Sequence, residues 1–200
     1  MQPIPFAVMP AAMVFDGLLV LWALGEISIR VISARNSAGD GGRPEWSSFI
    51  LILVSFAIGI GGAFFAAGHV TEAAFPLARW PIFTVGLLSI SAGLALRWWA
   101  VAVLGRSFTV QVRVRDDQQV VERGPFAVVR HPSYSGLLLV FLGVGLGLGN
   151  WLALIVAVIA PAAGIVFRIN VEERTLIAAL GDAYRGYSRR VRFKLIPRVY

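Results

Sequence analysis

The feature that most constrains this chain is a long run without charge, because residues 133–167 contain no Asp, Glu, Lys or Arg. A helix needs roughly 20 mostly apolar residues to cross a bilayer, and this run is about twice that length. The turn signal Gly149-Asn150 lies near its midpoint. We therefore predict two short membrane helices that form a hairpin.

Three further apolar regions precede the hairpin, at residues 6–29, 46–68 and 80–104. Glu26 lies in the first region, and Arg97 lies in the third beside two tryptophans, a pattern typical of a helix end near the lipid headgroups. The composition agrees, because 58% of the 200 residues are hydrophobic and only 14% are charged, whereas water-soluble domains carry about 25% charged residues. The sequence predicts an all-α integral membrane protein with five transmembrane helices.

The basic residues predict the orientation of these helices. With five crossings, 16 of the 18 Lys and Arg residues fall on the side of the C-terminus, while Arg79 falls on the other side and Arg97 inside the membrane. Because cytoplasmic loops carry an excess of Lys and Arg, we expect the N-terminus outside and the C-terminus and active site in the cytoplasm. The net charge of +7 then reflects topology, so nucleic acid is not an expected partner. Residues 1–3 include no basic residue, so a cleavable signal peptide is not expected.

We interpret residues 1–200 as a single membrane-embedded domain, with three anchoring spans in 1–104 and the reactive, cofactor-binding region in 105–200. Apolar residues recur at helical spacing among basic residues near the end of the chain, namely Leu176, Ile177, Leu180, Tyr184, Tyr187 and Val191. This stripe predicts an amphipathic C-terminal helix on the cytoplasmic leaflet. The chain has no cysteine, which excludes thiolate nucleophiles and zinc–thiolate sites, and no metal site is expected.

The alternating glycines Gly143, Gly145, Gly147 and Gly149 superficially resemble a dinucleotide-binding loop. They follow an apolar run and not a strand, so we reject that interpretation. Glycines four residues apart instead favour close packing of helices within lipid.

Candidate site residues cluster at the ends of the predicted hairpin. Arg168 and Glu172 are four residues apart and share one helix face, while Glu173 lies about 100° further round. An ion pair at the end of a span is one interpretation. The other is a pocket in which Arg168 binds an anionic substrate and Glu172 binds a cofactor that carries an amine. His131 lies where the hairpin begins, within reach of both the preceding loop and the membrane.

Several short motifs together resemble the isoprenylcysteine carboxyl methyltransferase family over about residues 93–200. They are Leu104–Thr109, Gly124–Phe126, Arg130–Gly136 (Arg-His-Pro-Ser-Tyr-Ser-Gly), Glu172-Glu173, Gly181–Tyr184, Tyr187 and Ile196-Pro197. The pattern is shared with phospholipid methyltransferases and, more distantly, with sterol reductases. No recognisable motif lies in the first two spans.

The resemblance implies an S-adenosylmethionine site enclosed by the cytoplasmic loop, the hairpin and the C-terminal helix. The implied cofactor contacts are Gln111, Gln118, Gln119, Val120, Val121, Phe126, His131, Pro132, Ser133, Tyr134 and Glu172. Arg168 is the implied catalytic and substrate-binding residue. The chain departs from the eukaryotic pattern at two positions, since Gln118 replaces a histidine and Phe126 replaces a tyrosine.

These residues favour a methyltransferase that acts on the carboxylate of a prenylated cysteine or a similar lipophilic acid. A carboxylate is ionised at neutral pH and needs no general base, whereas an amine must first lose a proton, and Arg168 would repel an ammonium. Methylation of a phospholipid or another small lipophilic acceptor is the alternative. A nicotinamide-dependent membrane reductase and a non-catalytic membrane subunit are hypotheses of a different class. The expected partners are the lipophilic substrate and membrane lipids.

Overall fold

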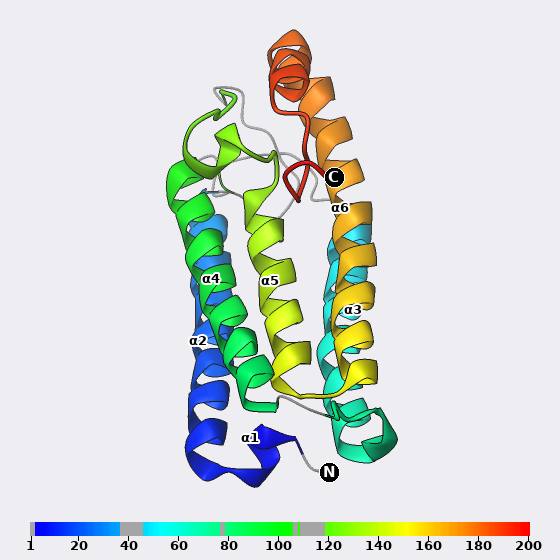
Figure 1. The fold of residues 1–200 in the computed structure, drawn as a ribbon. Helices are drawn as coiled ribbons and strands as arrows, with labels where there is room; N and C mark the ends of the chain where they lie inside the picture. The colour runs from blue at the N-terminus through cyan, green and yellow to red at the C-terminus, as the bar shows by residue number, and fades with distance from the viewer. Residues whose placement is uncertain (1–2, 37–45, 77–78, 106–107, 109–118) are drawn as a thin grey trace.

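The structure is a computed structural model that describes residues 3–36, 46–76, 79–105, 108 and 119–200. Within these ranges the chain is helical and contains no β-strand, apart from one isolated bridge between Ala74 and Asn150. The elements are α1 (Ile4–Ala7), α2 (Met9–Asn36), α3 (Trp46–His69), η1 (Thr71–Ala73), α4 (Arg79–Leu104), η3 (Gly124–Ala127), α5 (Pro132–Gly147) and α6 (Trp151–Arg190). The long helices lie side by side, and α6 projects beyond the others at one end (Figure 1).

Four helices, α2, α3, α4 and α6, are long and apolar enough to cross a membrane. They contain the three predicted N-terminal spans and the second arm of the predicted hairpin. The first arm, α5, is a shorter apolar helix of 16 residues. The first span differs from the prediction, because α1 ends at Ala7 and α2 begins anew at Met9, after an extended Val8. Pro10 favours this new start, since proline is tolerated in the first turn of a helix.

The predicted turn between α5 and α6 is confirmed. Gly149 has a φ of +64°, which glycine adopts without a steric penalty. Asn150 is the N-cap residue directly before α6. Its side-chain oxygen accepts a hydrogen bond of 3.0 Å from the backbone N–H of Ala153. Its side-chain nitrogen donates to the carbonyl of Val70 at 2.8 Å. The asparagine therefore caps α6 and fastens it to the end of α3.

Glycines bring α4 and α5 into backbone contact. A Cβ atom on Gly86 would lie 2.8 Å from the carbonyl oxygen of Gly143, and one on Gly93 would lie 2.5 Å from that of Gly136. Gly145 faces the other neighbour, because a Cβ there would lie 2.6 Å from Leu154 Cα in α6. Any side chain at these positions would force the helices apart. The predicted role of the α5 glycines in close packing is confirmed.

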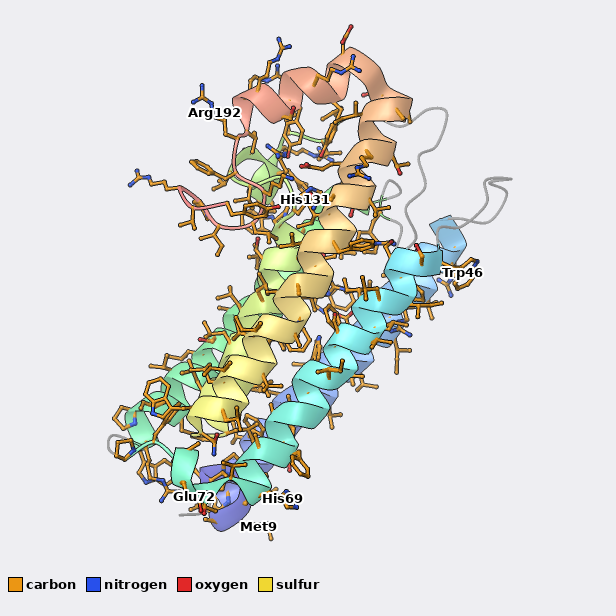
Figure 2. All side chains as sticks on the ribbon, turned by 90° about the vertical axis from the view of Figure 1, so that its right-hand side faces the viewer. Met9, Trp46, His69, Glu72, His131 and Arg192 are labelled. Carbon is orange, nitrogen blue, oxygen red and sulfur yellow. The ribbon has the colours of Figure 1, made fainter. Side chains whose placement is uncertain are left out.

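Beyond the charge-free run, α6 continues to Arg190 and breaks its helical geometry at Gly181, where φ is +55°. Figure 2 shows this end of α6 bending over the segment that contains His131. Tyr184, Tyr187 and Val191 are buried there as one cluster, which Val120 joins. The apolar stripe predicted to face the leaflet therefore contacts residues of the same chain.

Candidate functional site

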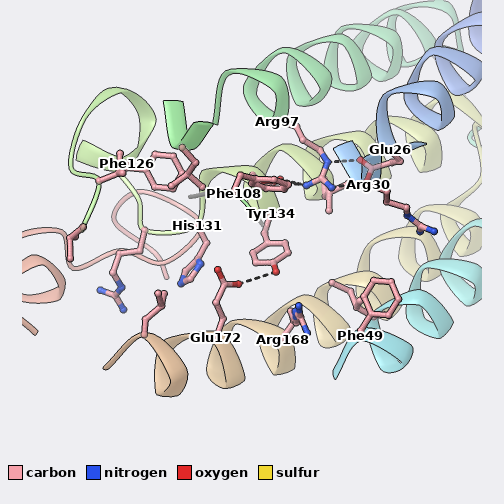
Figure 3. Close-up of a pocket in the computed structure, with 18 of the residues that line it drawn as sticks. Glu26, Arg30, Phe49, Arg97, Phe108, Phe126, His131, Tyr134, Arg168 and Glu172 are labelled. Atoms are coloured by element: carbon pink, nitrogen blue, oxygen red, sulfur yellow. Dashed lines mark hydrogen bonds and ion pairs between the residues drawn. The ribbon is translucent and has the colours of Figure 1, made fainter. Parts of the chain in front are cut away.

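A cavity of about 380 Å³ opens where the bundle meets this bent end of α6. We call residues 119–131 and 176–200 the cap, because they cover the end of the bundle. The cap, α5 and α6 supply the polar half of the cavity (Figure 3). The other half is apolar and is lined by Trp22, Ala23, Phe49, Ile52, Leu53, Phe56 and Leu137. The cavity thus joins polar and apolar surfaces at one place.

Arg168 and Glu172 lie one turn apart on α6, and both line the cavity. The Arg168 side chain is almost fully buried, with 2% of its surface exposed, and its Nη1 donates a hydrogen bond to Ser48 Oγ on α3. Glu172 is half-buried, and its Oε2 accepts a hydrogen bond of 3.0 Å from the hydroxyl of Tyr134 on α5. The shared face predicted from their spacing is confirmed, and it faces a cavity.

Glu173, the next residue, belongs to a different cluster. Its carboxylate pairs with Arg130 Nε at 2.7 Å, His131 Nε2 at 3.3 Å and Lys194 Nζ at 2.9 Å. It lies beyond the charge-free run. Burial alone would raise the pKa of the Glu173 carboxyl, but hydrogen bonds from His131, Arg130 and Lys194 lower that pKa to about 2. Glu173 is therefore an ionised structural residue.

The end of the chain holds the Arg-His-Pro motif in place. The backbone N–H groups of Arg130 and His131 each donate 2.9 Å hydrogen bonds, to the carbonyls of Phe193 and Lys194. Ser135 Oγ donates to the carbonyl of Leu195 at 2.6 Å. These bonds satisfy backbone and side-chain donors that would otherwise be buried without partners. The cap is consequently one hydrogen-bonded unit with the start of α5.

Two tyrosines of α6 add a neutral wall to the cap side of the cavity. Burial raises the pKa of the Tyr184 and Tyr187 hydroxyls, so both remain protonated phenols at neutral pH. The Tyr187 hydroxyl donates to the carbonyl of Phe126 at 2.8 Å, which fixes the short helix η3 on α6. The sequence identified both tyrosines as members of the stripe and did not assign them to the cavity.

Most of the predicted site residues lie together. The lining includes Gln119, Val120, Val121, Phe126, His131, Ser133, Tyr134, Arg168 and Glu172. Pro132 is buried at the first position of α5 and is not part of the lining. Gln111 and Gln118 lie outside the described residues.

The sequence interpretation assigned no site residue to α2, α3 or α4, and the first two of these helices carry no recognisable motif. Glu26 and Arg97 line the cavity, and Arg97 is buried inside the protein with 7% of its surface exposed. Its side chain points into the protein, where it pairs with Glu26. A signal was available, since ionisable residues within membrane spans are expensive and mark functional sites.

Comparison with known proteins points to one family. A sequence model of the isoprenylcysteine carboxyl methyltransferase (ICMT) family matches residues 84–178. A probable protein-S-isoprenylcysteine O-methyltransferase of Oryza sativa subsp. japonica is 31% identical over 160 residues, covering 78% of this chain and 83% of the relative. Protein-S-isoprenylcysteine O-methyltransferase B of Arabidopsis thaliana is 34% identical over 115 residues, covering 56% of this chain and 58% of the relative.

A relative of known structure shares the fold. The eukaryotic intramembrane Ras methyltransferase ICMT superimposes with a TM-score of 0.61, covering 98% of this chain and 70% of that one. The sequence identity is 23%, so this likeness speaks for the fold alone.

Proposed function

This chain belongs to the isoprenylcysteine carboxyl methyltransferase family of membrane O-methyltransferases, and from that premise we propose that it transfers a methyl group from S-adenosylmethionine to a lipophilic carboxylic acid. The acceptor we propose is a prenylated cysteine or an acid of similar shape. One observation carries this proposal: a buried guanidinium and a carboxylate lie one helical turn apart at the junction of the polar and apolar halves of a single cavity.

The polar half of the cavity fits the proposed cofactor. S-adenosylmethionine supplies an electrophilic methyl group and carries an ammonium, a carboxylate and an adenosine. The Glu172 carboxylate suits the ammonium, because charge-assisted hydrogen bonds are roughly twice as strong as neutral ones. The apolar side chains of Val120, Phe126 and Leu176 line the same half and suit an adenine ring. The implied contacts are Gln111, Gln118 to Val121, Phe126, His131 to Tyr134 and Glu172.

Arg168 is the residue that we propose binds and orients the acceptor carboxylate. A carboxylate acceptor is already ionised, so this chain has to orient the nucleophile and exclude water. Holding the reacting groups in attack geometry is the main way in which such a site lowers the barrier. The alternative phospholipid amine would need a base. Two candidate bases, Glu173 and His131, are engaged with each other where α6 meets the cap, and Glu173 also pairs with Arg130 and Lys194.

The apolar half of the cavity suits the hydrophobic part of the acceptor, which we propose enters sideways from the bilayer. This half is formed by α2, α3 and α5, and all three helices are apolar. We propose five crossings, with the C-terminus in the cytoplasm and the polar half of the cavity on the cytoplasmic side. At 1.5 Å per residue α5 is about 24 Å long, which spans most of the roughly 30 Å hydrocarbon core.

A thermal-shift measurement in detergent tests the proposed cofactor class. Adenosylhomocysteine, the product form of the cofactor, should stabilise the protein by about 2.7 kcal/mol at 100 times its dissociation constant, and NADPH should not. Stabilisation by NADPH alone would contradict the methyltransferase proposal.

Variants on α6 test whether Arg168 contacts the acceptor and not the cofactor. Arg168→Ala should keep the stabilisation by adenosylhomocysteine and lose most methyl transfer, because the guanidinium contacts the acceptor. Arg174→Ala is the matched control, since Arg174 is exposed on the same helix, and it should behave as the unaltered protein. Equal loss of activity in both variants would remove the special role of Arg168.

A further inference from the structure

Glu26 on α2 and Arg97 on α4 form a partly buried ion pair at the wall of the cavity. Arg97 Nε donates to Glu26 Oε1, and Arg97 Nη2 donates to Glu26 Oε2 at 2.6 Å. Side-chain exposure is 8% for the arginine and 23% for the glutamate. Figure 3 shows both side chains meeting beside the cavity, away from Glu172. The pairing is two-pronged, the geometry in which arginine holds a carboxylate most specifically.

The third nitrogen of the same guanidinium, Nη1, donates a hydrogen bond to a residue of α5. Arg97 Nη1 donates to Ser133 Oγ at 2.7 Å and approaches the Ser133 carbonyl oxygen at 3.4 Å. Ser133 lies in the first turn of α5, directly before Tyr134, whose hydroxyl donates to Glu172. A continuous series of contacts therefore runs from α2 through α4 and α5 to the carboxylate on α6.

Stability alone does not explain why charged residues occupy these positions. Charges within membrane spans are costly, and a buried ion pair often stabilises a protein no better than apolar residues of the same volume. The pair does fasten a helix that has few other anchors. In the most apolar 18-residue stretch of each helix, only 17% of α2 is buried inside the protein, against 39% of α6.

From this arrangement we infer that Glu26 and Arg97 are positioning residues for the cofactor site. Glu26 orients the guanidinium of Arg97, and Arg97 fixes Ser133 and with it the first turn of α5. That turn carries Tyr134 to the carboxylate of Glu172. This inference rests on the proposed function, since it assigns these residues to the same cofactor site.

Substitution of Ser133 removes its contact with Arg97 without changing either member of the ion pair, and the cycle with Glu26 separates this contact from any direct contact of Ser133 with the cofactor. Ser133→Ala should weaken adenosylhomocysteine binding about tenfold, because a buried charged donor loses its partner, and Ser133→Thr should restore it. Isothermal titration in detergent measures the affinity, and a melting curve without ligand checks the fold. Ser91→Ala on α4 is the control, because the Ser91 hydroxyl bonds within its own helix, and it should change neither quantity.

A double-mutant cycle tests whether Glu26 acts through Ser133. Glu26→Gln should weaken binding on its own and add little in the Ser133→Ala background, since residues in one network are not additive. Additive losses, or losses that follow the melting temperature and that threonine does not restore, would overturn the inference. If the unaltered protein binds but Ser133→Ala binds equally well, the inference alone fails. If the unaltered protein binds no adenosylhomocysteine, the proposed function fails with it.

Discussion

Glu172 and Glu173 are adjacent and chemically identical, yet the structure gives them different surroundings. Glu173 pairs with three basic side chains, two from the segment directly before α5 and one near the end of the chain. In the part of the chain that the structure describes, Glu172 accepts one hydrogen bond, from Tyr134, and lines the cavity. The two side chains point about 100° apart around α6, so one lines the cavity and the other joins the ion cluster.

The comparison shows how one short motif can hold a fold together and bind a ligand. Glu173 joins the cap to the bundle, and this junction forms the polar wall of the cavity. Glu172 presents its carboxylate to a ligand that enters the cavity. We therefore expect substitutions of Glu173 to appear mainly in stability and substitutions of Glu172 mainly in binding.

The largest expected effect is on stability. Glu173→Ala leaves Arg130, His131 and Lys194 without their carboxylate and should lower the free energy of unfolding by about 3–5 kcal/mol. Asp182→Ala is the control, because the Asp182 side chain is 96% exposed, and it should change stability by less than about 1 kcal/mol. Unfolding in detergent measures both. Equal effects of the two substitutions would break the comparison.

The next effect is on binding. Glu172→Gln removes the negative charge and should weaken adenosylhomocysteine binding by about 1.5–3 kcal/mol, roughly 10- to 150-fold, with an unchanged melting temperature in the absence of ligand. Isothermal titration is the measurement. Unchanged affinity in this variant would sink the assignment of Glu172 to the cofactor.

The pH dependence of stability tests the ion cluster of Glu173. The pKa of Glu173 is about 2 in the folded protein, below its ordinary value of 4.5, so the unfolded chain binds more protons between these values. The stabilisation by Glu173 is therefore complete above about pH 4.5 and is lost as the pH falls toward 2. The difference in melting temperature between the unaltered protein and Glu173→Gln should shrink over this window. A difference in melting temperature that stays constant or widens on acidification would contradict the stabilising role of the Glu173 ion cluster.

The smallest effect concerns the neighbour of Glu172. Tyr134→Phe removes the hydroxyl that donates to Glu172 Oε2 and should weaken adenosylhomocysteine binding by about 1 kcal/mol, roughly fivefold. Tyr200→Phe serves as the control, because Tyr200 does not line the cavity, and it should leave the affinity unchanged. A larger loss in Tyr134→Phe than in Glu172→Gln would reverse the expected order.

Much of the architecture was predictable, because lipid imposes simple rules on sequence. Apolar runs with few or no charges identified the helices that could cross a membrane, and Gly149-Asn150 identified the turn between α5 and α6. The break at Val8 and the bend of α6 at Gly181 were not predicted, since both depend on contacts made after the helices assemble. The apolar stripe of α6 could not reveal whether protein or lipid would cover it.

The site was predictable where residues are close in the chain or in a motif. The spacing of Arg168 and Glu172 sufficed to place them on one face. The pairing of Glu26 with Arg97 joins helices that are far apart in sequence, and no periodicity encodes which helix will be a neighbour. Likewise the partners of Glu173 come from the segment before α5 and from Lys194, so nothing local distinguished it from Glu172.

Product analysis tests the central claim most directly. Purified protein in lipid vesicles would receive S-adenosylmethionine with a labelled methyl group and a prenylated cysteine that has a free carboxyl group. The account predicts a labelled methyl ester, released as methanol by mild base, that forms in the unaltered protein and is largely lost in Arg168→Ala. A base-stable N-methyl product on a phospholipid, with no ester on the prenylated cysteine, would contradict it.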